Sequence, residues 1–298
     1  MKQITILSGK GGTGKTTLTA VFAALARRVV VADCDVGAPN LHMLLHPEII
    51  EEQDFTGSKL AIIDETKCVK CGFKCGLCRE KCRFNAINED LKVDQFSCEG
   101  CGVCALACPM SAITLIERVT GRIYISRIKF GFMVHALLDP GKANSGKLVA
   151  LVRGKAKALA EKENINILLI DGPPGIGYPA ISSVAGVDIG LVIAEPTLSG
   201  IHDLESAIPT KTFRYSSFVC VNMYDINLNN TERIERLCEE NNVEVIGRIP
   251  SDLKVTEAIV NGKTIIEHSP ESGVAEEIKR TWKRILECAD LYAEGLKH

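Results

Sequence analysis

The segment from Gly9 to Thr16 reads Gly-Lys-Gly-Gly-Thr-Gly-Lys-Thr and fits the phosphate-loop pattern G-x-x-x-x-G-K-[ST]. The backbone N–H groups of such a loop, and of the helix that follows it, converge on phosphate oxygens. We expect Lys15 to reach the β- and γ-phosphates of ATP and the Thr16 hydroxyl to bind Mg²⁺. The whole segment is expected to contact the nucleotide, ATP or ADP: Gly9, Lys10, Gly11, Gly12, Thr13, Gly14, Lys15, Thr16 and Thr17.

Three acidic residues at the ends of apolar runs complete the predicted ATP site. Asp171 follows residues 167–170 and begins the sequence Asp-Gly-Pro-Pro-Gly. A carboxylate in this position can hold Mg²⁺ directly or through water, and the stiff loop after it can respond to the γ-phosphate. Asp33 and Asp35 end a second apolar run, and one of them is expected to orient the attacking water or Mg²⁺.

The second group of reactive residues is a cluster of cysteines. Nine of the thirteen cysteines lie between Cys68 and Cys108. The later ones follow the spacing Cys-x2-Cys-x2-Cys-x3-Cys-Pro, in which three cysteines bind one [4Fe–4S] cluster and the fourth binds another. A zinc site, the alternative, needs only paired Cys-x2-Cys units and explains neither the third cysteine nor the Cys-Pro ending. The later cysteines are Cys98, Cys101, Cys104 and Cys108.

The earlier cysteines repeat this pattern 26 residues upstream, where Cys75, Cys78 and Cys82 match Cys101, Cys104 and Cys108. The repeat fails at its first position, because the residue 26 before Cys98 is Gly72. Either Cys68 or Cys71 must take that place, and the sequence leaves the choice open. We expect one cluster to bind Cys75, Cys78, Cys108 and one of Cys68 and Cys71, and the other to bind Cys82, Cys98, Cys101 and Cys104.

The residues around these groups predict an α/β protein with a mostly parallel sheet covered by helices on both faces. Short apolar runs alternate with helix-length segments, and the cysteine segment interrupts the alternation. We therefore predict a phosphate-loop ATPase domain formed by residues 1–63 and 118–298, with an α+β, ferredoxin-like iron–sulfur domain inserted at 64–117. The apolar runs lie at residues 4–7, 29–33, 167–170, 189–194, 218–221 and 244–246.

Three segments together resemble the deviant phosphate-loop ATPases that include MinD, ParA and the nitrogenase iron protein. They are Lys10-Gly-Gly-Thr-Gly-Lys-Thr16, Asp33-Cys-Asp-Val36 with Pro39-Asn-Leu41, and Asp171-Gly-Pro-Pro-Gly175. With the cysteine segment between the second and the third, the sequence is similar to MinD-superfamily ATPases that carry an inserted ferredoxin domain, over nearly the whole chain. Gly37 departs from the pattern, which has an acidic residue there in close relatives.

The resemblance implies roles for individual residues of the ATP site. Lys10 would cross a dimer interface to the partner's nucleotide, and Lys15 would bind the phosphates in its own chain. Asp35 would position the catalytic water in one switch segment, and Asp171 would begin the other. The implied Mg²⁺ ligands are Thr16, Asp35 and Asp171, and the residues implied around the adenine are Asn222, Pro250 and Asp252.

These features predict a Mg²⁺-dependent ATPase that couples its nucleotide state, in an ATP-dependent homodimer, to electron transfer through two [4Fe–4S] clusters. Hydrolysis is expected to be slow and to depend on a redox or iron–sulfur protein that the sequence does not identify. One alternative is an iron–sulfur assembly carrier, although such carriers hold a cluster on a Cys-x2-Cys pair that is absent outside the cysteine segment. Another is a MinD-like positioning protein whose clusters only stabilise the fold.

Composition argues against several other classes of protein. The formal net charge of −2 gives no basic surface for nucleic acid, and the absence of a run of about 18 apolar residues argues against a membrane partner. The chain enters its first strand at once, which leaves no room for a signal peptide, and clustered cysteines without one predict the reducing cytoplasm. His135 and Lys147 also attract attention, but the sequence leaves their roles open.

Overall fold

The computed structural model describes residues 1–68, 75–140, 145–175, 177–208 and 216–295. The chain divides into two compact units. The first unit consists of Met1–Glu52, Ile123–Leu137 and Gly146–His298, and the second of Gln53–Arg122 and Leu138–Ser145. The second unit thus extends on both sides beyond residues 64–117, the insert that the cysteine pattern predicts.

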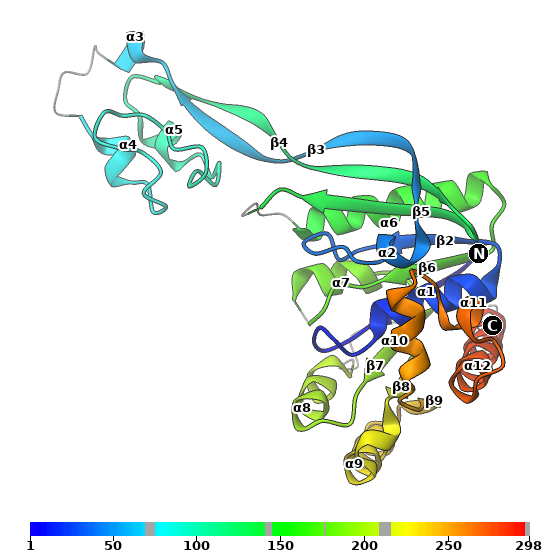
Figure 1. The fold of residues 1–298 in the computed structure, drawn as a ribbon. Helices are drawn as coiled ribbons and strands as arrows, with labels where there is room; N and C mark the ends of the chain where they lie inside the picture. The colour runs from blue at the N-terminus through cyan, green and yellow to red at the C-terminus, as the bar shows by residue number, and fades with distance from the viewer. Residues whose placement is uncertain (69–74, 141–144, 176, 209–215, 296–298) are drawn as a thin grey trace. The chain divides into compact units, whose positions relative to one another are not determined.

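Figure 1 shows the helices and strands in chain order. The strands are β1 (Lys2–Leu7), β2 (Val29–Asp33), β3 (Glu48–Ile63), β4 (Ile113–Ile128), β5 (Gly131–Leu138), β6 (Ile167–Asp171), β7 (Ile189–Ala194), β8 (Ser216–Asn222) and β9 (Glu244–Ile249). The helices are α1 (Lys15–Ala26), α2 (His42–Leu45), α3 (Glu65–Cys68), α4 (Leu77–Glu80), α5 (Val103–Ala107), α6 (Ser145–Lys162), α7 (Tyr178–Val184), α8 (Leu198–Ala207), α9 (Leu228–Glu240), α10 (Leu253–Val260), α11 (Ile265–His268) and α12 (Gly273–Gly295), with a 3₁₀ turn at Tyr224–Ile226.

One sheet joins the strands in the order β3-β4-β5-β2-β6-β1-β7-β8-β9, and the pairs from β5 to β9 are parallel. Strands β2 and β7 are buried along their whole length, and β6 is buried from its second residue onward. A strand buried on both faces reads as a continuous apolar run, which is why the sequence predicts these three strands so well. The α/β fold with a mostly parallel sheet is therefore confirmed.

Alternate residues of β1 show that helices pack on both faces of this sheet. Ile4 and Ile6 join the core that contains α1 and α12, where the rings of Phe22 and Trp282 stack with centroids 5.3 Å apart. Thr5 lies between them and points to the other face, because successive side chains of a strand alternate. There its hydroxyl donates to the backbone oxygen of Ser183 in α7 at 3.0 Å.

Helix α12 is the longest helix described, with 23 residues. Ile278, Trp282 and Ile285 lie along one side of it and are buried in the core. This amphipathic pattern indicates a helix that covers a sheet. None of the helices in the described ranges is both long enough and apolar enough to cross a membrane.

The second unit has a small core of its own, formed around its cysteines. Helices α4 and α5 both begin after a glycine with a positive φ angle, Gly76 at 47° and Gly102 at 80°. These positions correspond in the 26-residue repeat, so both halves turn in the same way. The core consists of Ala61, Cys78, Ile87, Cys104 and Ile113, with Cys82, Cys98 and Cys108 packed against it.

Candidate functional site

The buried carboxylate of Asp171 lies at the centre of a hydrogen-bonded group at the phosphate loop. Strands β1 and β6 are parallel neighbours with Ile6 opposite Asp171, so the carboxylate emerges beside the loop that follows β1. The Lys15 ammonium lies 2.7 Å from Asp171 Oδ1, and the Thr16 hydroxyl donates to Asp171 Oδ2 at 2.9 Å. The Lys15 and Asp171 side chains are only 6% and 1% exposed, so this ion pair is almost entirely removed from water.

Thr19 also belongs to this group, and the sequence analysis missed it. Its hydroxyl lies 3.0 Å from Asp171 Oδ1 and 3.0 Å from the backbone oxygen of Lys15. The signal was available, because residues four apart on a helix share a face and Thr19 follows Lys15 by four positions.

Two further carboxylates lie close to Asp171. Burial and the negative charge of Asp171 raise the pKa of Asp33, whose Oδ2 is buried and accepts no hydrogen bond from any described residue. Asp35 is half-buried; burial raises its pKa, and the nearby Lys15 partly offsets this rise. Mg²⁺ prefers oxygen ligands, and Asp171 Oδ2 and the Thr16 hydroxyl offer two such oxygens side by side. The residues present therefore fit a Mg²⁺ site.

Lys10, the second lysine of the loop, is bound within its own chain. Its ammonium forms an ion pair with Glu195 and lies 2.8 Å from the Ser199 hydroxyl. Glu195 follows β7 and is 8% exposed, and its Oε1 also accepts a hydrogen bond of 3.0 Å from Thr197. Glu195 was not among the residues predicted from the sequence, although Glu195 follows an apolar strand as Asp33 and Asp171 end theirs.

A pocket borders the phosphate loop on the side of β8. Asn222, Pro250 and Asp252 line it together with Gly12, Gly14 and Thr17, so the predicted adenine residues and the loop share one cavity. The amide of Asn222 donates to the backbone oxygen of Thr13 at 2.9 Å. Asp252 also caps α10 by accepting from the N–H of Lys254 at 2.9 Å.

The glycine at position 14 makes this approach of Asn222 to the loop possible. Gly14 has φ 87°, which side chains rarely allow, and a Cβ there would lie 2.4 Å from Nδ2 of Asn222. The pocket wall therefore depends on a residue without a side chain.

In the second unit, four cysteines line one small pocket. The four are Cys82, Cys98, Cys101 and Cys104, and the remaining lining is largely apolar. Burial raises the pKa of the Cys104 thiol, and neighbouring Cys98 and Cys101 raise it further. This set joins three cysteines of the later half with one of the earlier half.

Three other cysteines of the second unit, Cys68, Cys78 and Cys108, form a second group. Burial raises the pKa of the Cys78 thiol, and the charges of Cys68 and Cys108 raise it further, so these three lie near one another. Cys75 precedes α4, while Cys71 lies outside the described residues.

The two halves of the repeat also share a backbone feature, because backbone N–H groups point at a cysteine sulfur in both. Ala86 donates to Cys82 Sγ, and Ala112 donates to Cys108 Sγ, each at 3.4 Å.

Within the described ranges, no three His, Cys, Asp or Glu side chains are grouped to hold a single metal ion, and the described cysteines are all free thiols. Four thiols around a largely apolar pocket, with backbone N–H groups directed at sulfur, are ligands that fit an iron–sulfur cluster.

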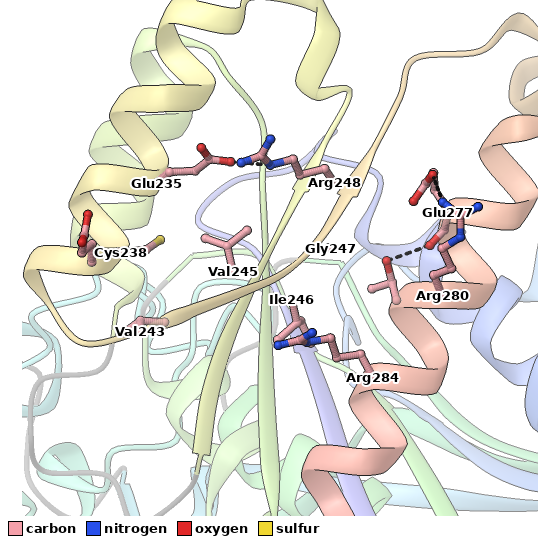
Figure 2. A pocket seen from close by; sticks show the side chains of 12 residues that line it. Glu235, Cys238, Val243, Val245, Ile246, Gly247, Arg248, Glu277, Arg280 and Arg284 are labelled. Carbon is pink, nitrogen blue, oxygen red and sulfur yellow. Dashed lines mark hydrogen bonds and ion pairs between the residues drawn. The ribbon is translucent and has the colours of Figure 1, made fainter.

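A cleft lies away from these residues, between α9, β9 and α12. Figure 2 shows Arg248 facing Glu235, at 2.5 Å, and Glu277 beside Arg280, also at 2.5 Å. The third arginine, Arg284, pairs with Glu244. Each of these three arginines is therefore paired with a glutamate.

His135 and Lys147 lie outside both groups. The His135 ring stacks on Tyr124 with centroids 5.0 Å apart, and its Nδ1 has no hydrogen-bond partner among the described residues. Burial lowers the pKa of His135 to about 4, so its imidazole is neutral near pH 7. Lys147 lies on the exposed side of α6.

Comparison with known proteins shows the family of this chain. The family described as the CobQ/CobB/MinD/ParA nucleotide binding domain matches residues 4–265. An uncharacterized protein of Methanocaldococcus jannaschii is 32% identical over 289 residues, which cover 96% of both chains. The iron–sulfur cluster carrier protein of the same organism is 22% identical over 303 residues, covering 96% of this chain and 84% of that one.

Among solved structures, the septum site-determining protein MinD of Pyrococcus horikoshii, complexed with Mg-ADP, superposes with a TM-score of 0.58. The alignment covers 98% of each chain at 19% identity. At this identity the match shows a shared fold.

Proposed function

The chain belongs to the CobQ/CobB/MinD/ParA family of nucleotide-binding proteins, and we propose that it is an ATPase that couples its nucleotide state to electron transfer through two [4Fe–4S] clusters. The observation that carries this proposal is the presence, in one chain, of the Lys15–Asp171 group and a pocket lined by four cysteines. The Lys15–Asp171 group has the donors that a phosphate loop uses, and the cysteine-lined pocket has the thiols that an iron–sulfur cluster needs.

In the first unit, Lys15 exchanges Asp171 for the β- and γ-phosphates when ATP enters. Thr16 and Asp171 then offer oxygen atoms to Mg²⁺, which would neutralise phosphate charge and fix the geometry of the phosphates. Asp35 orients the attacking water, and ATP is hydrolysed to ADP and phosphate. The adenine occupies the pocket between Asn222 and Asp252, which adjoins the loop.

In the second unit, the two groups of thiols hold the clusters, which would accept and donate single electrons. Cys82, Cys98, Cys101 and Cys104 bind one cluster, and Cys75, Cys78 and Cys108 bind the other with a fourth ligand. Cys68 and Cys71 are the two candidates for that fourth ligand, and only Cys68 lies within the described residues. The residues between the two halves of the ATPase domain then form a ferredoxin-like module.

The dimer gives Lys10 its role in this proposal. In the isolated chain Lys10 is paired with Glu195, so it must leave that carboxylate to reach the nucleotide of a partner subunit. ATP binding in two subunits supplies the phosphate charge that competes for the ammonium. Movement of the loops after Asp35 and Asp171 then alters the exposure or the potential of the clusters.

The first test is the iron and acid-labile sulfide content of the full chain purified without oxygen, together with an EPR spectrum of the reduced protein. Two clusters predict about eight irons and eight sulfides per chain. A Cys104→Ser variant should lose iron. The Cys220→Ser variant also replaces a buried cysteine, but one of the first unit, and should keep its iron. Stoichiometric zinc without iron, or equal iron in both variants, would overturn the cluster assignment.

A second candidate function is an iron–sulfur cluster carrier, because one relative of the chain bears that name. The test is transfer of iron and sulfide to an apo-ferredoxin, followed by the loss of visible absorbance from this protein. Stable absorbance during repeated oxidation and reduction supports electron transfer, and stoichiometric loss to the acceptor supports the carrier.

A third candidate is a MinD-like positioning protein with structural clusters, favoured by the fold it shares with a septum site-determining protein. It predicts clusters that resist oxygen and do not change redox state within the range of cellular reductants.

A further inference from the structure

We propose that Thr19 is a positioning residue for Mg²⁺ binding, because it holds the Asp171 carboxylate in place after the other two donors leave it. This inference rests on the proposed ATPase function and concerns one hydroxyl of this chain. Thr19 is fully buried, and its hydroxyl lies 3.0 Å from Asp171 Oδ1.

Three donors surround the Asp171 carboxylate. Lys15 and Thr19 lie against Asp171 Oδ1, and Thr16 donates to Oδ2. When nucleotide and Mg²⁺ bind, Lys15 turns to the phosphates and Thr16 to the metal. Thr19 is the only one of these three donors without a role toward nucleotide or metal.

The position of Thr19 decides which carboxylate oxygen faces the metal. Thr19 lies one helical turn below Lys15 on α1, in the buried interior, and contacts Oδ1. Oδ2 is the oxygen on the side of Thr16, the expected Mg²⁺ ligand. A fixed Oδ1 therefore leaves Oδ2 directed at the metal, whereas a free carboxylate can rotate about its χ2 angle.

The buried charges around Asp171 make a fixed orientation of its carboxylate important for Mg²⁺ binding. Asp33 is buried nearby, and its burial and the charge of Asp171 raise the pKa of Asp33. Once Lys15 moves to the phosphates, Asp171 needs a neutral donor that does not compete with the metal for Oδ2. The Thr19 hydroxyl is such a donor.

A purely structural role for Thr19 is the competing explanation. The hydroxyl also lies 3.0 Å from the backbone oxygen of Lys15, the common contact of a threonine with the preceding helical turn. Its single proton serves one of these acceptors at a time. Loss of the backbone contact alone would change stability and leave the Mg²⁺ dependence unchanged, so the two roles can be separated.

The test uses Thr19→Val, which keeps the shape and removes the hydroxyl, and Thr19→Ser, which keeps the hydroxyl. The full chain, purified without oxygen, is titrated with Mg²⁺ in the presence of a fluorescent N-methylanthraniloyl-ATP, and ATPase activity is followed in parallel. We expect the Mg²⁺ concentration for half-maximal binding to rise about tenfold in Thr19→Val, because a hydrogen bond to a charged group is lost. Thr19→Ser should stay within about twofold of the wild type.

The matched control is Thr5→Val, which removes another fully buried hydroxyl, one that donates to Ser183 instead of Asp171. Its Mg²⁺ dependence should equal that of the wild type, and Thr19→Ala replaces Thr19→Val if the latter does not fold. The inference is overturned if Thr19→Val and Thr5→Val have the same Mg²⁺ dependence, or if Thr19→Ser is as impaired as Thr19→Val. A wild-type protein whose nucleotide binding ignores Mg²⁺ would instead refute the proposed ATPase function.

Discussion

The ammonium of Lys10 is paired with the carboxylate of Glu195 in the same chain, at the rim of the phosphate loop. We predict that Glu195→Gln lowers the ATP concentration needed for dimer formation by about twofold to fivefold, because Lys10 no longer has to leave a charged partner. Sedimentation velocity or light scattering over an ATP titration measures this shift.

Ser199→Ala is the control for this prediction. It removes a neutral partner of Lys10, 2.8 Å from the ammonium, and keeps the Glu195 charge. Its effect should be smaller than that of Glu195→Gln. An increased ATP requirement in Glu195→Gln would show that Glu195 holds Lys10 in its working position.

The buried pair of Lys15 and Asp171 predicts a large effect on stability. Lys15→Ala leaves Asp171 without its cation and next to Asp33, so the free energy of unfolding of the nucleotide-free protein should fall by about 3–5 kcal/mol. Urea denaturation measures this change. Lys10→Ala, in the same loop but with a side chain 32% exposed, should change it by less than about 1 kcal/mol. Equal effects of the two variants would refute the buried-pair argument.

His135 predicts a specific loss of stability in acid. The folded protein protonates this histidine only near pH 4, whereas the unfolded chain protonates it near 6.5. The unfolded state therefore binds more protons in this window, and the free energy of unfolding should fall by up to about 2 kcal/mol between pH 6.5 and 5. His135→Phe keeps a ring on Tyr124 and should remove this part of the acid sensitivity. Urea titrations that give the same pH dependence for both proteins would contradict the prediction.

Two glycines predict opposite responses to alanine. A Cβ on Gly247 would lie 2.4 Å from the Thr281 hydroxyl, and Thr281 is a buried, branched residue of α12. Gly247→Ala should therefore destabilise the protein by about 1–3 kcal/mol. A Cβ on Gly154 meets nothing within 4 Å in the middle of α6, so Gly154→Ala should stabilise it by about 0.5–1 kcal/mol. Thermal unfolding distinguishes the two, and a shift of the same sign in both would contradict this packing.

The sequence predicts the central strands because their burial makes them apolar. It does not predict the length of β3 and β4, each of 16 residues, because most of β3 is exposed and its residues Glu48–Gln53 show no inward face. Charged, exposed strands lack the alternation on which such predictions depend. The short helices α7, α8, α10 and α11 also went unpredicted, since four to ten residues give little periodicity.

The sequence predicts the parts of the candidate site that lie within one motif. It predicts less well the contacts between residues that are distant in the sequence. The phosphate loop and the crossed grouping of cysteines follow from spacing alone. Glu195 and Thr19 act through contacts with Lys10 and Asp171 that exist only once β1, β6 and β7 are side by side. Single acidic or hydroxyl residues at strand ends and on helix faces are common, so their types alone did not identify them.

The central claim, that nucleotide state controls the clusters, is tested most directly by a redox titration of the anaerobically purified chain followed by EPR. The titration is repeated without nucleotide, with Mg-ADP and with a non-hydrolysable ATP analogue in the presence of Mg²⁺. The account predicts that the ATP analogue shifts the midpoint potential of at least one cluster relative to Mg-ADP, and that Lys15→Ala removes the shift. Identical potentials in all three states, in a protein that binds the nucleotides, would contradict it.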